Sequence, residues 1–364
     1  MYLSEAEKKQ LNNSGFAHRK KLSGGYGCLW DDCGKRTINA HAISRQASLV
    51  HFSTNKKLFV MDTKNAVPLQ KMEFSCRGIK QIFAFNIFCH THDQIFSKID
   101  LGIFNTLYDC LLQVYRTMTF NLFQQRCAND HRYWVWNNVL KRCDNTEAYI
   151  YAKHEDDSKY LPIMNLIELE KNNVEELIQK QCGINEKIVT NNAIYKLNDK
   201  CILLYSSVPF VIPVAVANTL FLSINSSPAI FNYSIIPNCN TTDMIFYFDE
   251  NVDFQKTWQE SSKTPIEIIN IIESLLIQSD YWAVKPEIIK NAPLWKRKLI
   301  EEDVFCNLLQ KFLTPCDYSI FDELRQEFLN MESNEIQAAE RDKLTIKPDR
   351  EDFSERFKQV MKMI

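Results

Sequence analysis

Glycine is scarce in this chain, which holds eight glycines among its 364 residues. Closely spaced glycines let backbone amides approach phosphate groups in Walker loops and in dinucleotide-binding turns. Neither pattern occurs in the sequence, and internal repeats and low-complexity linkers are absent as well. We therefore do not expect ATP-driven work from this chain alone.

A surplus of one charge is also lacking, since the formal net charge is −2 and the pI is about 6.4. The overall balance therefore does not indicate a nucleic-acid-binding protein. The charges are unevenly distributed, however: residues 1–60 hold ten Lys or Arg against four Asp or Glu, and the remainder is acidic on balance. A basic surface suits a polyanion, and it is equally typical of a solvated N-terminal face.

The sequence opens with a charged stretch and no apolar leader, so we expect no signal peptide. Twelve cysteines are present, but their spacing shows no disulfide ladder. The later ones, such as Cys110, Cys201 and Cys306, lie in apolar runs where a free thiol packs as a small hydrophobe. This usage predicts a reduced, cytoplasmic protein.

Residues 201–242 contain no charged side chain, which raises the question of a membrane span. A spanning helix needs about 20 apolar residues. Here Pro209 and Pro213 interrupt the first part of the run, and Asn218 interrupts the second. Buried β-strands explain the run better, and we expect no membrane span.

Two pairs of zinc-type ligands are present near the N-terminus. Cys28 and Cys33 are separated by four residues, and Cys89 and His92 by two. Thiolate and imidazole bind Zn²⁺ tetrahedrally, and two ligands on one tight turn need only a few residues between them. The spacing predicts a closed, structural Zn²⁺ site, which would contribute directly to folding.

Two further residues connect this zinc pattern with chemistry. His41 follows the first ligand pair by eight residues, and Asp93 comes directly after His92. The stretch resembles a zinc-stapled HNH (ββα-metal) endonuclease module of the bacterial multi-domain type. The resemblance implies that His41 is the general base and that Asp93 holds a catalytic Mg²⁺ or Mn²⁺ on the scissile phosphate. It implies a β-hairpin over residues 40–44 with a return strand near residues 56–61, and a helix beginning near Cys89.

The resemblance is incomplete at two positions. The residue before the histidine is often a metal ligand in HNH enzymes, and here it is Ala40. The usual asparagine of the motif is out of register, although Asn86 is nearby. A carboxylate would then have to come from elsewhere, and Asp62 is one candidate. Nucleic-acid contacts would come from Lys35, Arg36, Arg45 and Arg116.

The remainder of the chain also has a recognisable order. Apolar residues recur at helical steps from Ile103 to Leu122 and predict one buried helix face. A Tyr115-Arg116 pair on this helix, followed by the Ile-Ile-Pro turn at residues 235–237, is similar to a group of bacterial proteins built on the same HNH-like module. The fold expected is α+β. The expected divisions are residues 1–100 for the zinc module, 101–145 for connecting helices, 146–260 for a β-rich domain and 261–364 for a helical C-terminal region.

Three functions remain open from the sequence. The first is a metal-dependent phosphodiesterase that cuts nucleic acid, with DNA as the expected substrate and bacterial anti-phage defence as a setting. The second is a non-catalytic, zinc-stabilised module that binds nucleic acid or protein, which the alanine at position 40 favours. The third is a membrane-associated effector using residues 201–242. The C-terminal helices are candidates for binding a protein partner or for self-association.

Overall fold

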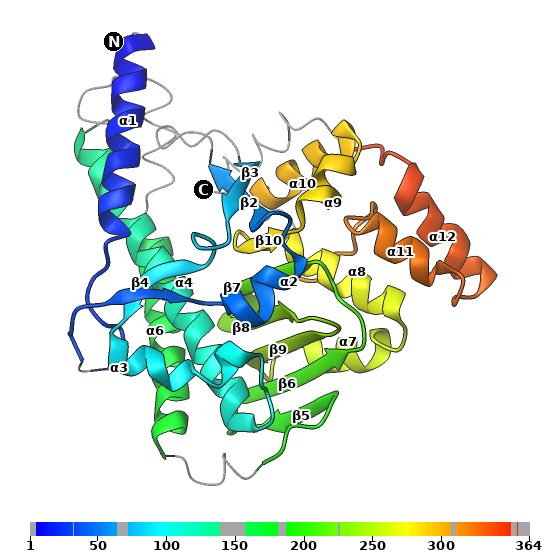
Figure 1. Ribbon diagram of the computed structural model, residues 1–364, viewed down its shortest axis with the longest axis horizontal. Helices are drawn as coiled ribbons and strands as arrows, with labels where there is room; N and C mark the ends of the chain where they lie inside the picture. Colours follow the sequence, from blue (N-terminus) through cyan, green and yellow to red (C-terminus); the bar gives the residue numbers. More distant parts are fainter. Residues whose placement is uncertain are drawn as a thin grey trace.

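The computed structural model describes residues 5–31, 33–63, 72–138, 157–180, 187–224, 226–306, 311–350 and 355. Helices and strands are both abundant, and the expected mixed α+β class is confirmed (Figure 1). Helix α1 extends beyond the rest of the molecule in this view, while the other elements surround one large sheet.

The described residues up to Asn138 supply four strands, four helices and three single-turn helical segments. These are α1 (Glu5–Leu22), β1 (Ile38–His41), η1 (Arg45–Leu49), α2 (Val50–Phe52), β2 (Lys57–Thr63), β3 (Met72–Gly78), β4 (Ala84–Phe88), α3 (His90–Asp93), η2 (Gln94–Phe96), η3 (Ile99–Leu101) and α4 (Leu107–Asn138). The described elements after residue 156 are α6 (Asp157–Lys180), β5 (Ala193–Lys196), β6 (Cys201–Val208), β7 (Val214–Ile224), β8 (Ser227–Pro237), β9 (Thr242–Asp249), α7 (Phe254–Ser261), α8 (Pro265–Leu276), β10 (Trp282–Val284), α9 (Pro286–Asn291), α10 (Leu294–Phe305), α11 (Asp322–Leu329) and α12 (Asn334–Thr345).

Eight of the strands form one antiparallel sheet in the order β3-β2-β10-β7-β8-β9-β6-β5. Side chains of a strand alternate between the two faces of its sheet. On β6, Leu203 therefore packs with the N-terminal half of the chain, while Ile202 and Leu204 pack with the C-terminal helices. Both faces of the central strands are covered.

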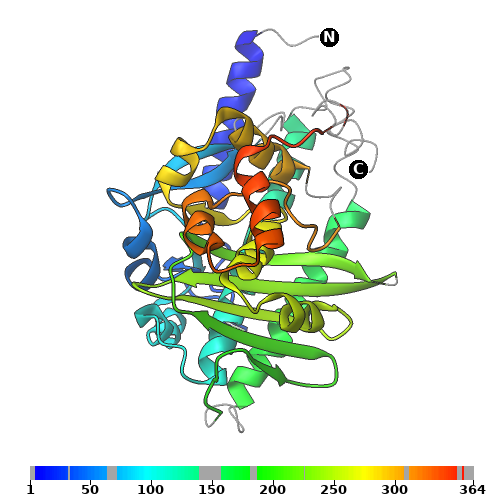
Figure 2. The same ribbon diagram turned by 90° about the vertical axis from the view of Figure 1, so that its right-hand side faces the viewer.

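The sheet is the middle of three layers. Helices α4 and α6 lie against one face, and α7 and α8 lie against the other (Figures 1 and 2). This double covering explains the uncharged run of residues 201–242, because most of its side chains point into one core or the other. In the described part of the chain, no helix is both long and apolar enough to cross a bilayer.

Helix α4 differs from the prediction of one buried face. From Asp109 to Phe123 every residue is buried, polar ones included. The helix is enclosed by α1, α6, β4 and the large sheet. Some of its polar side chains are paired there: Gln113 donates to the Ala42 carbonyl at 3.0 Å, and Thr117 bonds Ser234 at 2.7 Å. Helix α4 thereby connects the N-terminal segments to the sheet.

The expected pairing of the first strand with a return strand near residues 56–61 is wrong. Strand β1 pairs with β4, 43 residues further along from His41 to Ala84, in a separate two-stranded sheet. Residues 57–63 form β2 of the large sheet instead, paired with β3 and β10. The large sheet consequently takes strands from three of the four expected divisions of the chain.

Elsewhere the expected elements are found with altered limits. Strand β7 begins directly after Pro213 and continues through Asn218, the residue expected to interrupt the uncharged run. Helix α8 begins where Thr264 and Glu267 form a capping box with Pro265 in the first turn. Of the C-terminal helices considered for self-association, α11 and α12 are described, whereas residues 351–364 apart from Glu355 lie outside the described residues.

Candidate metal centre and polar cluster

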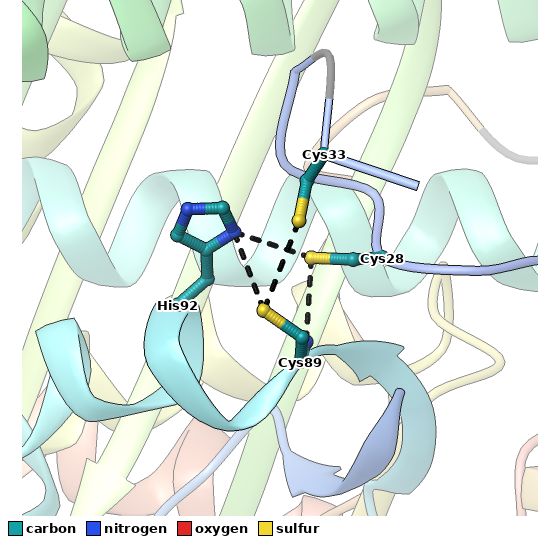
Figure 3. A group of neighbouring side chains, drawn as sticks. All are labelled: Cys28, Cys33, Cys89 and His92. Atoms are coloured by element: carbon teal, nitrogen blue, oxygen red, sulfur yellow. Dashed lines mark hydrogen bonds between the residues drawn. The ribbon is translucent and has the colours of Figure 1, made fainter. Parts of the chain in front are cut away.

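The four predicted zinc ligands converge on one point (Figure 3). Their donor atoms all lie within 4.8 Å of one another. The Cys33 and Cys89 sulfurs are 3.8 Å apart, and His92 Nδ1 lies 3.3 Å from the Cys28 sulfur and 3.6 Å from the Cys89 sulfur. Zinc bonds of about 2.3 Å to sulfur and about 2.0 Å to nitrogen give tetrahedral edges of about 3.8 and 3.5 Å. The quartet therefore has the dimensions of a tetrahedral site and could hold a zinc ion.

Local backbone geometry presents the first two ligands. The backbone amide of Cys28 donates to the Lys35 carbonyl at 2.9 Å and so closes the loop that holds Cys33. The backbone amide of Leu29 donates to the carbonyl of Ile87 on β4, also at 2.9 Å. Gly25 allows the preceding chain to approach β4. Its φ is +97°, and a Cβ there would lie 2.7 Å from the Asn86 carbonyl oxygen. Asn86 itself donates to the Ser23 carbonyl, so it anchors this approach.

An aromatic and charged stack supports His92 from behind. The Trp30 ring stacks on the His92 ring at 4.9 Å and contacts the Tyr115 ring of α4 at 5.0 Å. The Tyr115 hydroxyl donates to Glu175 at 2.7 Å, and Lys171 pairs with the same carboxylate at 3.1 Å. Burial and then the charge of Lys35 lower the pKa of His92, which favours the neutral imidazole that zinc binds.

A second cluster of polar side chains surrounds the end of β1. His41 is the last residue of that strand, and the strand pairing places it opposite Ala84. Burial, followed by the positive charges of Arg116 and Arg45, lowers the pKa of His41 to about 4. The imidazole is therefore neutral at pH 7. Its Nε2 atom is buried and has no hydrogen-bond partner among the described residues.

Asp93 and Arg116 belong to the same cluster. Asp93 lies on α3. Burial raises the pKa of its carboxyl group, and the nearby charge of Arg116 only partly opposes this rise. Its Oδ1 atom and the Nε atom of Arg116 are both buried, and neither finds a partner in the described part of the chain. Arg116, which the sequence analysis considered as a nucleic-acid contact, is only 2% exposed, and its guanidinium lies over the Phe96 ring at 5.0 Å.

Asp100 is a member of this cluster that the sequence reasoning missed. Its carboxylate accepts a hydrogen bond from Arg116 at 2.7 Å, and its charge acts on both His41 and Asp93. Asp100 lies seven residues after Asp93, and in a continuous helix this spacing would place both carboxylates on one face, which could have indicated that they belong together. The short segments η2 and η3 replace the continuous helix that such a spacing assumes.

The other residues considered from the sequence lie as follows. Arg45 begins η1, where it is half-buried, whereas Lys35 and Arg36 are exposed on the loop after the cysteine pair. Ala40 is buried in β1, and its methyl side chain offers no carboxylate there. Asp62 lies on β2 and accepts hydrogen bonds from Ser75 and Arg77 of the neighbouring strand β3.

Comparison of the chain with models of protein families, with curated proteins and with solved structures finds no match. The site must therefore be interpreted from its own chemistry. It consists of a quartet that could hold zinc and a second group of one imidazole, two carboxylates and one guanidinium, in which Asp93 follows the quartet's His92 on α3.

Proposed function

We propose that this chain is a metal-dependent nucleic-acid phosphodiesterase of the HNH type, with DNA as its substrate. One observation carries the proposal: His41 Nε2, Asp93 Oδ1 and Arg116 Nε are all buried without a partner in the described structure. An unsatisfied buried polar atom costs about 1–3 kcal/mol, more when charged. Three such atoms in one cluster are explained if a ligand that carries both positive and negative groups, such as a metal-bound phosphate, completes them.

The order of elements supports the same proposal. Strands β1 and β4 pair as an antiparallel unit, and α3 begins two residues after β4 ends. His41 ends the first strand, and Asp93 lies on the helix, directly after the zinc-type ligand His92. Strand, strand and helix in this order are the arrangement expected of a ββα-metal module.

The proposed chemistry divides between these side chains. A neutral His41 accepts the proton of the attacking water, which its lowered pKa permits at pH 7. A divalent cation bound by Asp93 would polarise the scissile phosphate and stabilise the charge that develops on it. Arg116 contributes a buried positive charge beside the same phosphate. Arg45, Lys35 and Arg36 extend the positive charge toward the flanking backbone of the nucleic acid.

The experiment is incubation of the zinc-loaded protein with supercoiled plasmid and Mg²⁺ or Mn²⁺. The wild-type chain is expected to nick or linearise the plasmid. His41→Ala should lower the rate by at least about 100-fold, since general bases contribute typically 10²–10⁴-fold. Zinc content and the circular dichroism spectrum should remain those of the wild type.

His51→Ala is the matched control, because His51 is an exposed histidine ten residues further on. It should cleave at the wild-type rate. Equal cleavage by His41→Ala would remove His41 as the base. Absence of cleavage by the wild-type chain on supercoiled, linear and single-stranded substrates would favour a non-catalytic zinc-stabilised binding module.

A further inference from the structure

A cavity of about 530 Å³ is formed where the large sheet meets the chain around η1 and η3. Tyr205 of β6, Asp243 of β9 and the turn after β8 form one part of its lining, and Ala47 and residues 101–105 contribute further parts. Small-molecule sites in proteins have volumes of about 300–1,000 Å³, so the cavity is large enough for a small ligand. Among the described residues, none from the polar cluster lines it. The cavity is therefore a second candidate site.

The backbone at Gly102 closes one side of this cavity. Its φ is +74°, and a Cβ there would lie 3.1 Å from the Ala47 Cβ and 3.2 Å from Asn238 Oδ1. The chain after η3 thus passes directly against η1 and against the turn between β8 and β9. That turn is closed by the Asn238 backbone amide, which donates to the Thr241 carbonyl at 2.8 Å. The wall of the cavity is consequently made of closely packed backbone.

Asp243 gives the cavity its charge. It is the only acidic side chain among the described lining residues, and no lysine or arginine is among them. The side chain belongs to a residue that is 6% exposed. The Tyr205 hydroxyl donates to its Oδ1 atom at 2.8 Å, and the Asn238 side-chain amide donates to its Oδ2 atom. Within the described part of the chain these donors are neutral, and no cation pairs with the carboxylate.

Neutral donors compensate this buried charge only in part. Hydrogen bonds from Tyr205, Ser207 and Asn238 lower the pKa of the Asp243 carboxyl group, but burial raises it by more. The Asn238 Oδ1 atom is a second buried acceptor here, and it has no partner among the described residues. Aspartate is rarely buried without a paired cation, because an uncompensated charge is costly in the interior. An anion such as a nucleotide phosphate would meet the same negative charge and no compensating lysine or arginine.

We propose that this cavity binds a small organic cation through an ammonium or guanidinium group that pairs with Asp243. Such a group carries a positive charge together with several N–H donors, and a carboxylate accepts more hydrogen bonds than one hydroxyl and one amide supply. Ca²⁺ and Mg²⁺ are less suited, since they need six or more oxygen ligands and the described lining offers one carboxylate. The site is independent of the proposed function, because neither Asp243 nor Tyr205 takes part in the cleavage chemistry.

The test is isothermal titration calorimetry of the zinc-loaded protein with agmatine, at constant ionic strength and without nucleic acid. Agmatine carries a guanidinium and an ammonium group on a four-carbon chain. The wild-type chain should bind one agmatine, and the neutral 1,4-butanediol should not bind. Asp243→Asn should weaken agmatine binding at least about tenfold, because a hydrogen bond to a charged group contributes at least that much to affinity. Asp249→Asn, at the other end of the same strand, is the matched control and should bind as the wild type does.

A second pair of variants tests the cavity from an exposed position. Cys239 lines the cavity and is exposed, so its replacement leaves the core intact. Cys239→Lys supplies an internal ammonium group and should weaken agmatine binding at least about tenfold, whereas Cys239→Ser should bind as the wild type does. If Asp243→Asn does not fold, this pair decides alone.

Four results would overturn the inference: no agmatine binding by the wild-type chain, wild-type affinity in Asp243→Asn, wild-type affinity in Cys239→Lys, or equal binding of 1,4-butanediol. Binding of Mg²⁺ that depends on Asp243, without binding of agmatine, would assign the cavity to a metal ion instead. N-acetyl-arginine methylamide presents the guanidinium group as a protein side chain does. Tighter binding of this compound than of agmatine would assign the cavity to a protein side chain and refute the small-molecule occupant.

Discussion

His41 is held in its neutral form by its surroundings. Burial removes water from the imidazole, and the positive charges of Arg116 and Arg45 oppose protonation further. Because the pKa of His41 is lower in the folded chain than in the unfolded chain, the free energy of unfolding depends on pH.

The unfolded chain protonates His41 near pH 6.5, while the folded chain does so only near pH 4. Between these values the unfolded state binds more protons, so this residue lowers the free energy of unfolding as the pH falls from about 6.5 to about 4. His41→Asn should remove that contribution. Urea unfolding at pH 7, 6 and 5 should show the variant gaining stability relative to the wild type as the pH falls.

Single residues also differ in how far they could be predicted. The zinc-type quartet was predictable because each ligand pair lies on one tight turn, where sequence spacing fixes distance. His41 and Asp93 were named from a resemblance, and the structure brings the charge of Arg116 onto both. Asp100 was missed because its neighbours Ser44 and Arg116 come from segments 56 and 16 residues away. No local pattern records such contacts.

Among the elements, α6 carries two lysine–glutamate pairs of the same spacing in opposite surroundings. Lys171 and Glu175 are 4% and 3% exposed, while Lys180 and Glu176 are 69% and 66% exposed. Glu175 also accepts from Tyr115 and from the Asp31 backbone amide, so it joins α6 to α4 and to the cysteine loop. The buried pair therefore belongs to the support of the metal centre.

Lys171→Met should leave Glu175 as an uncompensated buried charge and cost about 3–5 kcal/mol of the free energy of unfolding. Lys180→Met removes an exposed pair of equal spacing and should cost less than about 1 kcal/mol. Urea denaturation followed by circular dichroism measures both. Similar small costs for the two variants would show that Glu175 is solvated or neutral in the folded protein.

Element prediction failed where packing, not periodicity, decides. The apolar stripe of α4 was correctly assigned to a helix, but the helix is buried all round because two layers enclose it. A strand was correctly expected near residues 56–61, where β2 lies, but it was assigned to the wrong sheet. A strand's sequence reports its length and faces, and says little about which strand hydrogen-bonds to its edge.

For the whole molecule, the expected N-terminal division is not structurally separate. Strands β2 and β3 join the large sheet through β10, and β1, β4 and α4 share one hydrophobic core with the sheet. A fragment of residues 1–104 lacks α4, which covers this core, and lacks β10, which pairs with one edge of β2. Its thermal unfolding, followed by near-ultraviolet circular dichroism, should show no cooperative transition, whereas the full chain should show one. A sharp transition in the fragment would show that the zinc quartet and the β1–β4 pair suffice to fold it.

The pairing of β2 with β10 also has a consequence for biosynthesis. Strand β2 ends at Thr63 and its partner begins at Trp282, about 220 residues later. At roughly 5–20 residues per second, the ribosome needs on the order of 10–40 s to reach β10 after completing β2. During that interval the edge of the β2–β3 hairpin is open to other strands, including those of neighbouring nascent chains. The half of the protein made first thus reaches its native state only after most of the chain has been translated.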